Sequence, residues 1–283
     1  MFCVFVVLLY LAETTMPNPH LPAEVLDLIV DLLETESALR SCCLVSGSWI
    51  PRTRKHLFAD ISFVTERHLQ SWKKMFPDPS TSPAYYTKAL FVCCSHAVTV
   101  ADTEASGWIR GFSRVAHLEV GPRGLGGLLA HRRLATDLFP FHGLSLVIKS
   151  LHVNYLALPP SQILDLPLSF PLLEDLTVVT YRWPKTNSPG GLSTAARPSS
   201  LPRLTGSLLL KDGMRYIARQ LLSLPSGIHF RKVTLTWNYD DDPLSAMALV
   251  EGCSHTLEFL KITCHRFRAP VRHLCPHQQL TCF

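Results

Sequence analysis

The residues best suited to chemistry are cysteines and histidines near the C-terminus, whose side chains are typical zinc ligands. The candidates are Cys264, His265, His273, Cys275, His277 and Cys282. Structural zinc sites usually pair their ligands two to four residues apart within a knuckle. The sequence contains no C-x-x-C anywhere. We therefore expect no metal site in this tail and no cofactor in the chain.

Two further motifs suggest ligand binding, but their spacing does not support it. The glycines between Gly121 and Gly127 follow an expected strand, yet they match neither the dinucleotide fingerprint nor a Gly-Lys-Ser/Thr phosphate loop. A glycine-rich turn between repeats is the simpler interpretation. Asp240 to Asp242 could hold a hard cation, but just before Pro243 they are better placed to cap a helix.

Signatures of catalysis are also missing from the sequence. There is no G-x-S-x-G and no H-E-x-x-H, and no acid with a plausible base partner stands out among the 13 histidines. His117, His152 and His229 lie in or beside expected strands, where packed histidines are commoner than catalytic ones. We predict a chain that is not an enzyme and acts by binding.

Composition indicates a folded chain with weak nucleic-acid character. The 283 residues are 47% hydrophobic and 17% charged, which excludes disorder throughout. The formal charge of +5 comes from 27 basic and 22 acidic residues, and the basic clusters are short and scattered. We therefore expect no nucleic-acid partner.

The cysteines and the first residues give opposite indications of location. Nine cysteines are an odd number and lie mostly in apolar segments, which favours reduced thiols in the cytoplasm or nucleus. Met1 to Leu11 is an uncharged apolar run, too short to span a bilayer but of a length that suits a signal peptide. Translation from Met16 would remove it. We treat residues 1–20 as a leader and linker, with no membrane association unless the leader is retained.

Residues 21–60 carry helix start signals and more apolar surface than so short a segment can bury. Pro22 suits the first helical position, and Glu24 in the first turn faces the positive end of the helix dipole. After a break at residues 35–37, helical spacing resumes and continues through Trp49 to Leu57, which predicts three short helices. The apolar residues that these short helices cannot bury against one another must contact a partner or the rest of the chain.

An ordered set of anchor residues runs through this segment. They are Leu21, Pro22, Glu24, Val25, Leu26, Ile29, Leu32, Leu39, Cys42, Leu44, Val45, Ser46, Trp49, Leu57 and Phe58. Their order resembles an F-box, in the form common in fungal (basidiomycete-like) F-box proteins. The resemblance implies a three-helix module that docks the Skp adaptor of cullin–RING ubiquitin ligases, and through it a cullin. It places the docking surface on Leu21, Pro22, Ile29, Leu32, Leu39, Val45 and Trp49. The alternative is an ordinary helical hairpin inside a core.

Short alternating segments recur through residues 61–264 at the spacing of a repeat protein. Eight are expected strands: 61–63, 90–92, 118–120, 151–153, 176–178, 208–210, 233–235 and 260–262. Segments of helical period lie between them, at 69–76, 125–135, 214–222 and 244–251. Strands this short must stack side by side while helices cover them from behind, which predicts a curved parallel sheet.

Residues 115–120, 172–178 and 259–262 resemble the core of leucine-rich repeats as found in degenerate form in fungal F-box proteins. We therefore expect an α/β repeat protein: a three-helix F-box over residues 21–60, then an irregular leucine-rich-repeat-like solenoid over residues 61–264. Residues 265–283 abandon the repeat, so we expect an irregular tail, with either a truncated chain or a poorly covered sheet edge at this end.

The predicted function is a substrate-recognition subunit of a Skp–cullin–F-box ubiquitin ligase. The F-box would dock the adaptor, and the repeat region would bind an unknown target protein. The alternative is a secreted or membrane-associated leucine-rich-repeat-like interaction protein, with residues 1–11 as its targeting segment.

Overall fold

The computed structural model divides the chain into two compact units, Met1–Leu57 and Phe58–Phe283. It describes residues 22–45, 47–93, 107–121, 144, 147–154, 166–179, 204–211, 214–224, 226–237, 243–264 and 280–282. The leader at residues 1–20 and the Pro- and Ser-rich segment at 184–202 lie outside the described residues. Among the described residues, no helix is long and apolar enough to cross a membrane.

The first unit is a cluster of short helices, as predicted. Its elements are α2 (Ala23–Asp31), α3 (Glu36–Val45), the 3-10 turn η1 (Gly47–Trp49) and α4 (Ile50–Leu57). Pro22 precedes α2, and its carbonyl oxygen accepts hydrogen bonds from the amides of Val25 and Leu26. Helix α4 contacts both α2 and α3, so the three helices enclose a small common core.

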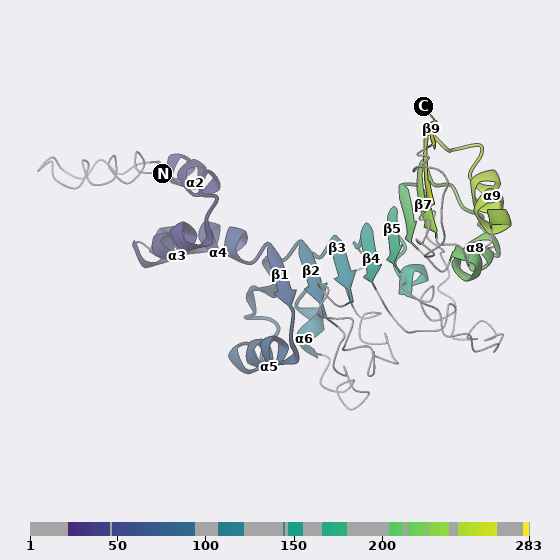
Figure 1. Ribbon diagram of the computed structural model, residues 1–283. Coiled ribbons are helices and arrows are strands. Elements are labelled where there is room, and N and C mark those ends of the chain that lie inside the picture. The colour runs from purple at the N-terminus through teal and green to yellow at the C-terminus, as the bar shows by residue number, and fades with distance from the viewer. Residues whose placement is uncertain are drawn as a thin grey trace, which may run out of the picture. The chain divides into compact units, whose positions relative to one another are not determined.

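The second unit is built on one sheet whose first eight strands are parallel and follow one another in sequence order (Figure 1). They are β1 (Asp60–Phe63), β2 (Ala89–Val92), β3 (His117–Val120), β4 (Ser150–Asn154), β5 (Asp175–Val179), β6 (Ser207–Lys211), β7 (Lys232–Trp237) and β8 (Phe259–Cys264). All eight predicted strands are present, each extended by one to three residues. The predicted parallel sheet of a leucine-rich-repeat-like solenoid is therefore confirmed.

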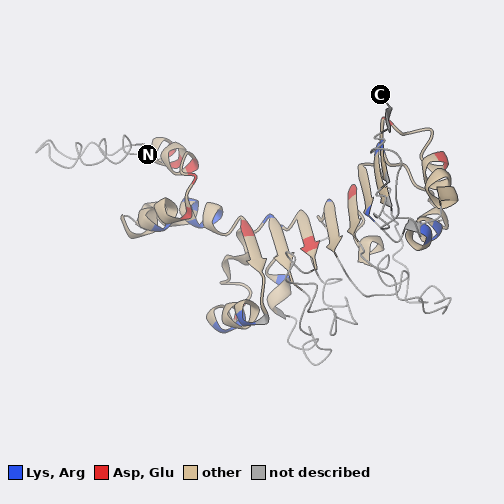
Figure 2. Ribbon diagram, in the orientation of Figure 1, with Lys and Arg blue, Asp and Glu red and all other residues tan. Residues whose placement is uncertain are grey.

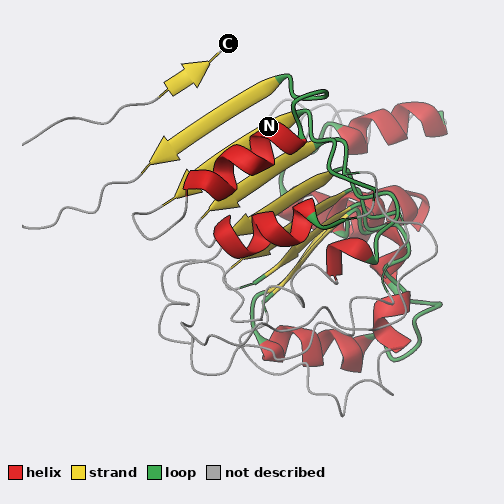
Figure 3. Ribbon diagram, turned by 90° about the vertical axis from the view of Figure 1, so that its right-hand side faces the viewer, coloured by secondary structure: helices red, strands yellow, loops and turns green. Residues whose placement is uncertain are grey.

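Helices of the second unit lie along one side of the sheet (Figures 1 and 3). They are α5 (Glu66–Met75), the 3-10 turn η2 (Pro83–Tyr86), α6 (Gly107–Arg110), α8 (Met214–Leu222) and α9 (Pro243–Gly252). Three of them match predicted helical segments, while the predicted helix at 125–135 lies outside the described residues. The sequence analysis missed α6 and η2, because four residues are too few to show a helical period.

Two rows of apolar side chains cross the sheet on its helix side. The strand register aligns the first row as Ile61, Leu90, Leu118, Leu151, Leu176, Leu208, Val233 and Leu260. It aligns the second as Phe63, Val92, Val120, Val153, Val178, Leu210, Leu235 and Ile262. The members on β1 to β7 belong to one continuous core, Leu260 of β8 is partly buried and packs against it, and Ile262 is also partly buried. Because strand side chains alternate, a slip of one residue would turn an apolar row out to solvent.

The same pair of backbone hydrogen bonds marks the entry to β2, β3, β4, β5, β7 and β8. The carbonyl oxygen of Lys88, just before β2, accepts from the amides of Ala116 and His117, which stand at the entry to β3. The pattern recurs from repeat to repeat with donor–acceptor distances of 2.7 to 3.3 Å. These paired bonds hold neighbouring repeats in register before the strand ladder begins.

A local variation of this pattern occurs between β5 and β6. The carbonyl oxygen of Glu174 accepts from the amide of Gly206, while the amide of Ser207 donates to Asp175 Oδ1 at 2.7 Å. A Cβ at position 206 would lie 2.5 Å from Asp175 Oδ1. Glycine is therefore required at position 206 by this close approach.

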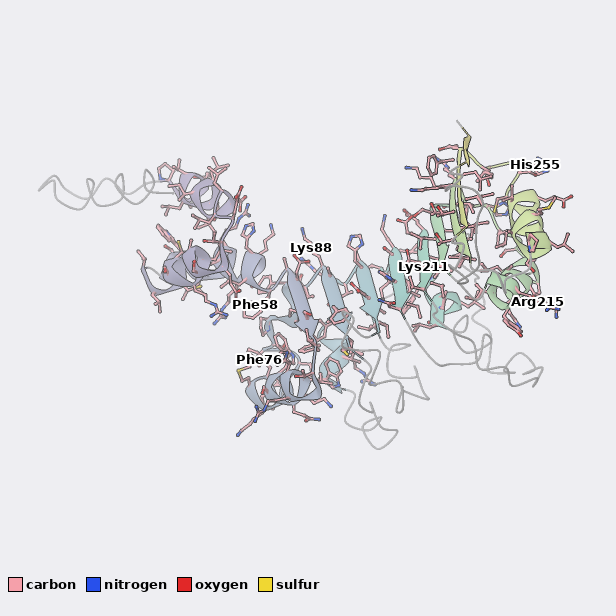
Figure 4. The ribbon with its side chains drawn as sticks, viewed as in Figure 1. Phe58, Phe76, Lys88, Lys211, Arg215 and His255 are labelled. Carbon is pink, nitrogen blue, oxygen red and sulfur yellow. The ribbon has the colours of Figure 1, made fainter. Side chains whose placement is uncertain are left out.

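An aromatic cluster covers the core beside β1, the first strand. Trp72 of α5 lies at its centre, with ring centroids 5.7 Å from Phe63, 4.7 Å from Phe76 and 6.1 Å from Phe58. Phe112 adds a further ring 5.7 Å from Trp72. Figure 4 labels Phe58 and Phe76, which belong to this cluster. These rings bury apolar surface at the first repeat, where no preceding repeat of the solenoid exists.

The other end of the sheet carries a short strand that the sequence analysis missed. Strand β9 (Leu280–Cys282) pairs antiparallel with residues Leu260 to Ile262 of β8. A strand of only three residues is too short for its sequence pattern to reveal it. It covers part of an edge that parallel stacking leaves open.

We predict that Leu176→Ala lowers the free energy of unfolding of the sheet unit by about 2–5 kcal/mol, because the side chain is fully buried and its removal leaves a cavity. Urea denaturation followed by tryptophan fluorescence measures this. Thr177→Ala, one residue along on the other side of the sheet, is the matched control and should change the midpoint little. Equal losses in both variants would contradict the assignment of the two faces.

Candidate protein-binding surfaces

Three predicted docking residues lie on the surface of the helical unit. Pro22 is exposed at the start of α2, Leu32 is 78% exposed just after that helix, and Val45 is 68% exposed at the end of α3. Ile29 is partly exposed. Leu21 lies outside the described residues. Within the described part of the helical unit, the side chains of Pro22, Leu32 and Val45 are therefore open to solvent.

The other two predicted docking residues, Leu39 and Trp49, are buried. Leu39 is 6% exposed and Trp49 7%, and both lie with Val30 and Thr53 in the interior of the helical unit. The Thr53 hydroxyl donates a hydrogen bond to the carbonyl oxygen of Trp49, so this buried polar group is satisfied. These residues hold the helices together beneath the surface.

The structure adds three exposed apolar residues that the sequence analysis had not placed on the docking surface. Leu28 is 63% exposed, Leu44 89% and Val25 38%. The sequence did indicate an excess of apolar surface over residues 21–60, more than so short a segment can bury. Helical spacing alone does not say which apolar face a small core uses. Single exposed apolar residues are ordinary, but five large ones within residues 25–45 are not.

Ionic contacts join α2 to α4 in this unit. Arg52 Nε lies 2.6 Å from Asp31 Oδ1, and an Arg52 Nη2 atom also pairs with Asp31 Oδ2. His56 Nε2 lies 2.7 Å from the same Oδ1 atom, and Asp27 is 3.9 Å from Arg52. Asp31 is thus the common partner of two side chains one turn apart on α4.

This arrangement lowers the pKa of Asp31 below its ordinary value of 3.8. The hydrogen bond from Arg52 is the largest cause, and the bond with His56 is the second. The same contact raises the pKa of Arg52. The side chains are about one-third exposed, so water and salt weaken the pair. The cluster joins α4 to α2, the helix that carries the exposed side chains of Val25 and Leu28.

The remaining candidates for chemistry give no reactive site in the described part of the chain. No group of three potential metal ligands occurs there. Cys42, Cys43, Cys93 and Cys253 form no disulfide in the described part of the chain, and burial raises the pKa of Cys42 and of Cys253. A raised pKa keeps a thiol protonated and therefore unreactive.

The motifs in loops and in the tail fall largely outside the described residues. These include Asp240 to Asp242, the glycines from Gly124 to Gly127, and the zinc candidates between residues 265 and 277. Gly121 is described, with a φ of +142°, and a Cβ there would overlap the carbonyl oxygen of Asn154. Close packing between repeats thus accounts for this glycine without any phosphate.

The side of the sheet away from the helices carries polar and charged residues. Its central row, from the strand register, is Ser62, Phe91, Glu119, His152, Thr177, Leu209, Thr234 and Lys261. Burial lowers the pKa of His152, although Glu119 opposes this effect. A neutral imidazole is therefore favoured, and the described row holds no nucleophile paired with a base. Figure 2 shows how charged residues are distributed over the strands and helices.

Comparison with known proteins gives no relative: no protein-family model matches the sequence, and neither does any curated protein. Functional inference therefore depends on the two surfaces described above.

We predict that Asp31→Asn lowers the thermal midpoint of the helical unit at pH 7, because the ionised carboxylate is favoured in the folded state. The lowered pKa means that this stabilisation is present above pH 3.8 and is lost as the pH falls further towards the folded-state pKa. The difference between variant and wild type should therefore shrink on acidification, as followed by circular dichroism.

The control for this experiment is Asp27→Asn, whose carboxylate reaches Arg52 only at 3.9 Å. A difference between Asp31→Asn and wild type that is unchanged from neutral to acidic pH would contradict the role given to the ionised Asp31.

Proposed function

We propose that this chain is a non-catalytic substrate receptor of a Skp–cullin–F-box ubiquitin ligase. Its helical unit, which resembles a fungal F-box in sequence, would dock the Skp adaptor and through it a cullin. Its sheet unit would bind the protein to be ubiquitinated. Such a receptor acts in the cytoplasm or nucleus, and its own chemistry is limited to binding.

One observation carries this proposal: a small helical unit exposes five large apolar side chains. Val25, Leu28, Leu32, Leu44 and Val45 are each at least 38% exposed. Burying a single leucine or valine side chain contributes about 1.5–3 kcal/mol. A partner that covered several of them would therefore gain enough free energy for specific binding.

In this proposal the seven residues implied by the F-box resemblance divide into two roles. Pro22, Leu32 and Val45, with partly exposed Ile29, lie where an adaptor would contact them. Leu39 and Trp49 pack beneath and set the positions of the helices. Leu21 precedes the described residues, and its role rests on the resemblance alone.

The sheet unit supports the second half of the proposal. Repeats of strand and helix present a continuous row of side chains from neighbouring strands, which suits the binding of an extended or folded protein surface. Among the described residues, no group of three or more potential metal ligands occurs. Binding is the function that these features favour.

We predict that the double substitution of Leu32→Asp and Val45→Asp weakens binding to purified Skp adaptor at least ~100-fold. Each carboxylate would replace an apolar contact worth at least about 1.5 kcal/mol and would be desolvated in the complex. Isothermal titration calorimetry with the full chain measures the change, and circular dichroism checks that the helices remain folded.

The matched control also places two aspartates at exposed apolar positions, but on the sheet unit: Leu172→Asp with Met247→Asp. Leu172 is 51% exposed and Met247 is 67% exposed. Adaptor binding should survive this change. Failure of the wild-type chain to bind the adaptor, or equal weakening in both double variants, would refute the docking assignment.

A further inference from the structure

Helix α9 lacks the charged outer side that a surface helix normally carries. Its one charged residue is Glu251, in the last turn. Ala246 and Leu249 are buried in the core of the sheet unit, whereas Leu244 is 69% exposed and Met247 is 67% exposed. A helix that is apolar all round is usually covered on every side. The core covers α9 only on the side of Ala246 and Leu249, so its outer side is suited to a contact with another protein.

The neighbouring helix α8 extends this apolar surface. The two helices pack against each other (Figure 1). On α8, Tyr216 is 45% exposed and Leu222 is 38% exposed, and each lies three residues from Arg219 on the same side of the helix. We define the α8–α9 face as the exposed side chains of Tyr216, Arg219, Leu222, Leu244, Met247 and Glu251.

A hollow of about 440 Å³ opens between the two helices on this face. Its lining includes Ala218 and Leu222 from α8 and Leu244 and Ala248 from α9. The small side chains of the two alanines leave room that a larger side chain from outside can fill. Met247 is the neighbour of Ala248 in the chain but is not part of this lining. One face therefore carries both a recess and an exposed apolar side chain beside it.

The α8–α9 face also carries opposite charges on its two helices. Arg219 lies on α8 and Glu251 on α9, and both are exposed. Neither forms an ion pair with another residue of the described part of the chain. When a second copy is turned by a two-fold axis, the cation of each copy can meet the anion of the other. The charges of this face are thus complementary to those of an identical face.

We propose that the α8–α9 face binds a second copy of this chain about a two-fold axis that passes between the helices. In this dimer Met247 of each copy enters the hollow of the other, and Arg219 of each copy lies beside Glu251 of the other. Both copies use the same surface, so the contact closes and does not extend into a filament. The inference goes beyond the proposed function and does not depend on it.

The size of the face sets the strength of this association. A stable interface buries about 800 Å² on each partner and involves about 20 to 30 residues a side. The α8–α9 face has four exposed apolar side chains at its centre, which is fewer than a permanent dimer needs. We therefore expect a weak dimer, with half of the chains paired at roughly 10–100 μM.

Sedimentation equilibrium of the full chain, from about 5 to 300 μM and without adaptor, measures the dissociation constant of the dimer. Leu244→Asp with Met247→Asp should weaken dimerisation at least ~10-fold, because the contact would desolvate the new carboxylates. The matched control is Met75→Asp with Leu172→Asp, at positions of the same unit that are 64% and 51% exposed. It should leave the dissociation constant within about twofold. Circular dichroism checks that each variant is folded.

A charge exchange tests the two-fold arrangement itself. Arg219→Glu alone, or Glu251→Arg alone, would place like charges together twice in each dimer and should weaken it at least ~5-fold. Combining both changes in one chain restores opposite charges at each contact and should return the dissociation constant to within about twofold of the wild-type value. Arg67→Glu on α5, which matches the net charge of Arg219→Glu, should have little effect.

Four results would overturn the proposal. They are a wild-type chain that stays monomeric up to about 300 μM, equal weakening in the two double aspartate variants, and no recovery when the charge changes are combined. The fourth is a dimer that survives Leu244→Asp with Met247→Asp but is lost in Leu32→Asp with Val45→Asp, which would assign the contact to the helical unit. Adaptor binding is measured separately by calorimetry, so failure of the dimer and failure of adaptor docking are distinguishable.

Discussion

Burial of two apolar rows against one layer of helices is the constraint on which the sheet unit depends. Each strand contributes only two or three inward side chains, such as Leu176 and Val178 on β5, which is too few to form a core. Stacking eight strands in register makes those pairs continuous, and the paired hydrogen bonds at each strand entry set the register. With the inner side committed to packing in this way, the outer side is left to carry polar and charged residues at little cost to stability.

The helical unit distributes its apolar residues differently from the sheet unit. It is too small to bury all of its apolar residues, so Val30, Leu39 and Trp49 form its interior while Leu28, Leu32, Leu44 and Val45 stay exposed. The ionic contacts of Asp31 with α4 fix how α2 is presented. An apolar surface on a unit held in shape by its own core is suited to docking, because little order has to be gained on binding.

The sequence predicted the repeating elements well and the side-chain environments less well. Eight strands could be located because alternation such as Leu151-His152-Val153 is short-range information. The sequence could not predict which F-box-like anchors are buried, as Leu39 is, and which are exposed, as Leu32 is. Both are leucines at helical spacing, and only tertiary packing separates them. Strand β9 escaped prediction because its partner is set by the sheet edge.

The central claim is that the two units have separate binding tasks, with the helical unit reserved for an adaptor. Hydrogen–deuterium exchange of the full chain, with and without saturating Skp adaptor, tests this most directly. The account predicts slower exchange within residues 22–57 when the adaptor is bound and unchanged exchange in the strands of the sheet unit. Unchanged exchange within residues 22–57, or protection confined to the sheet, would contradict it.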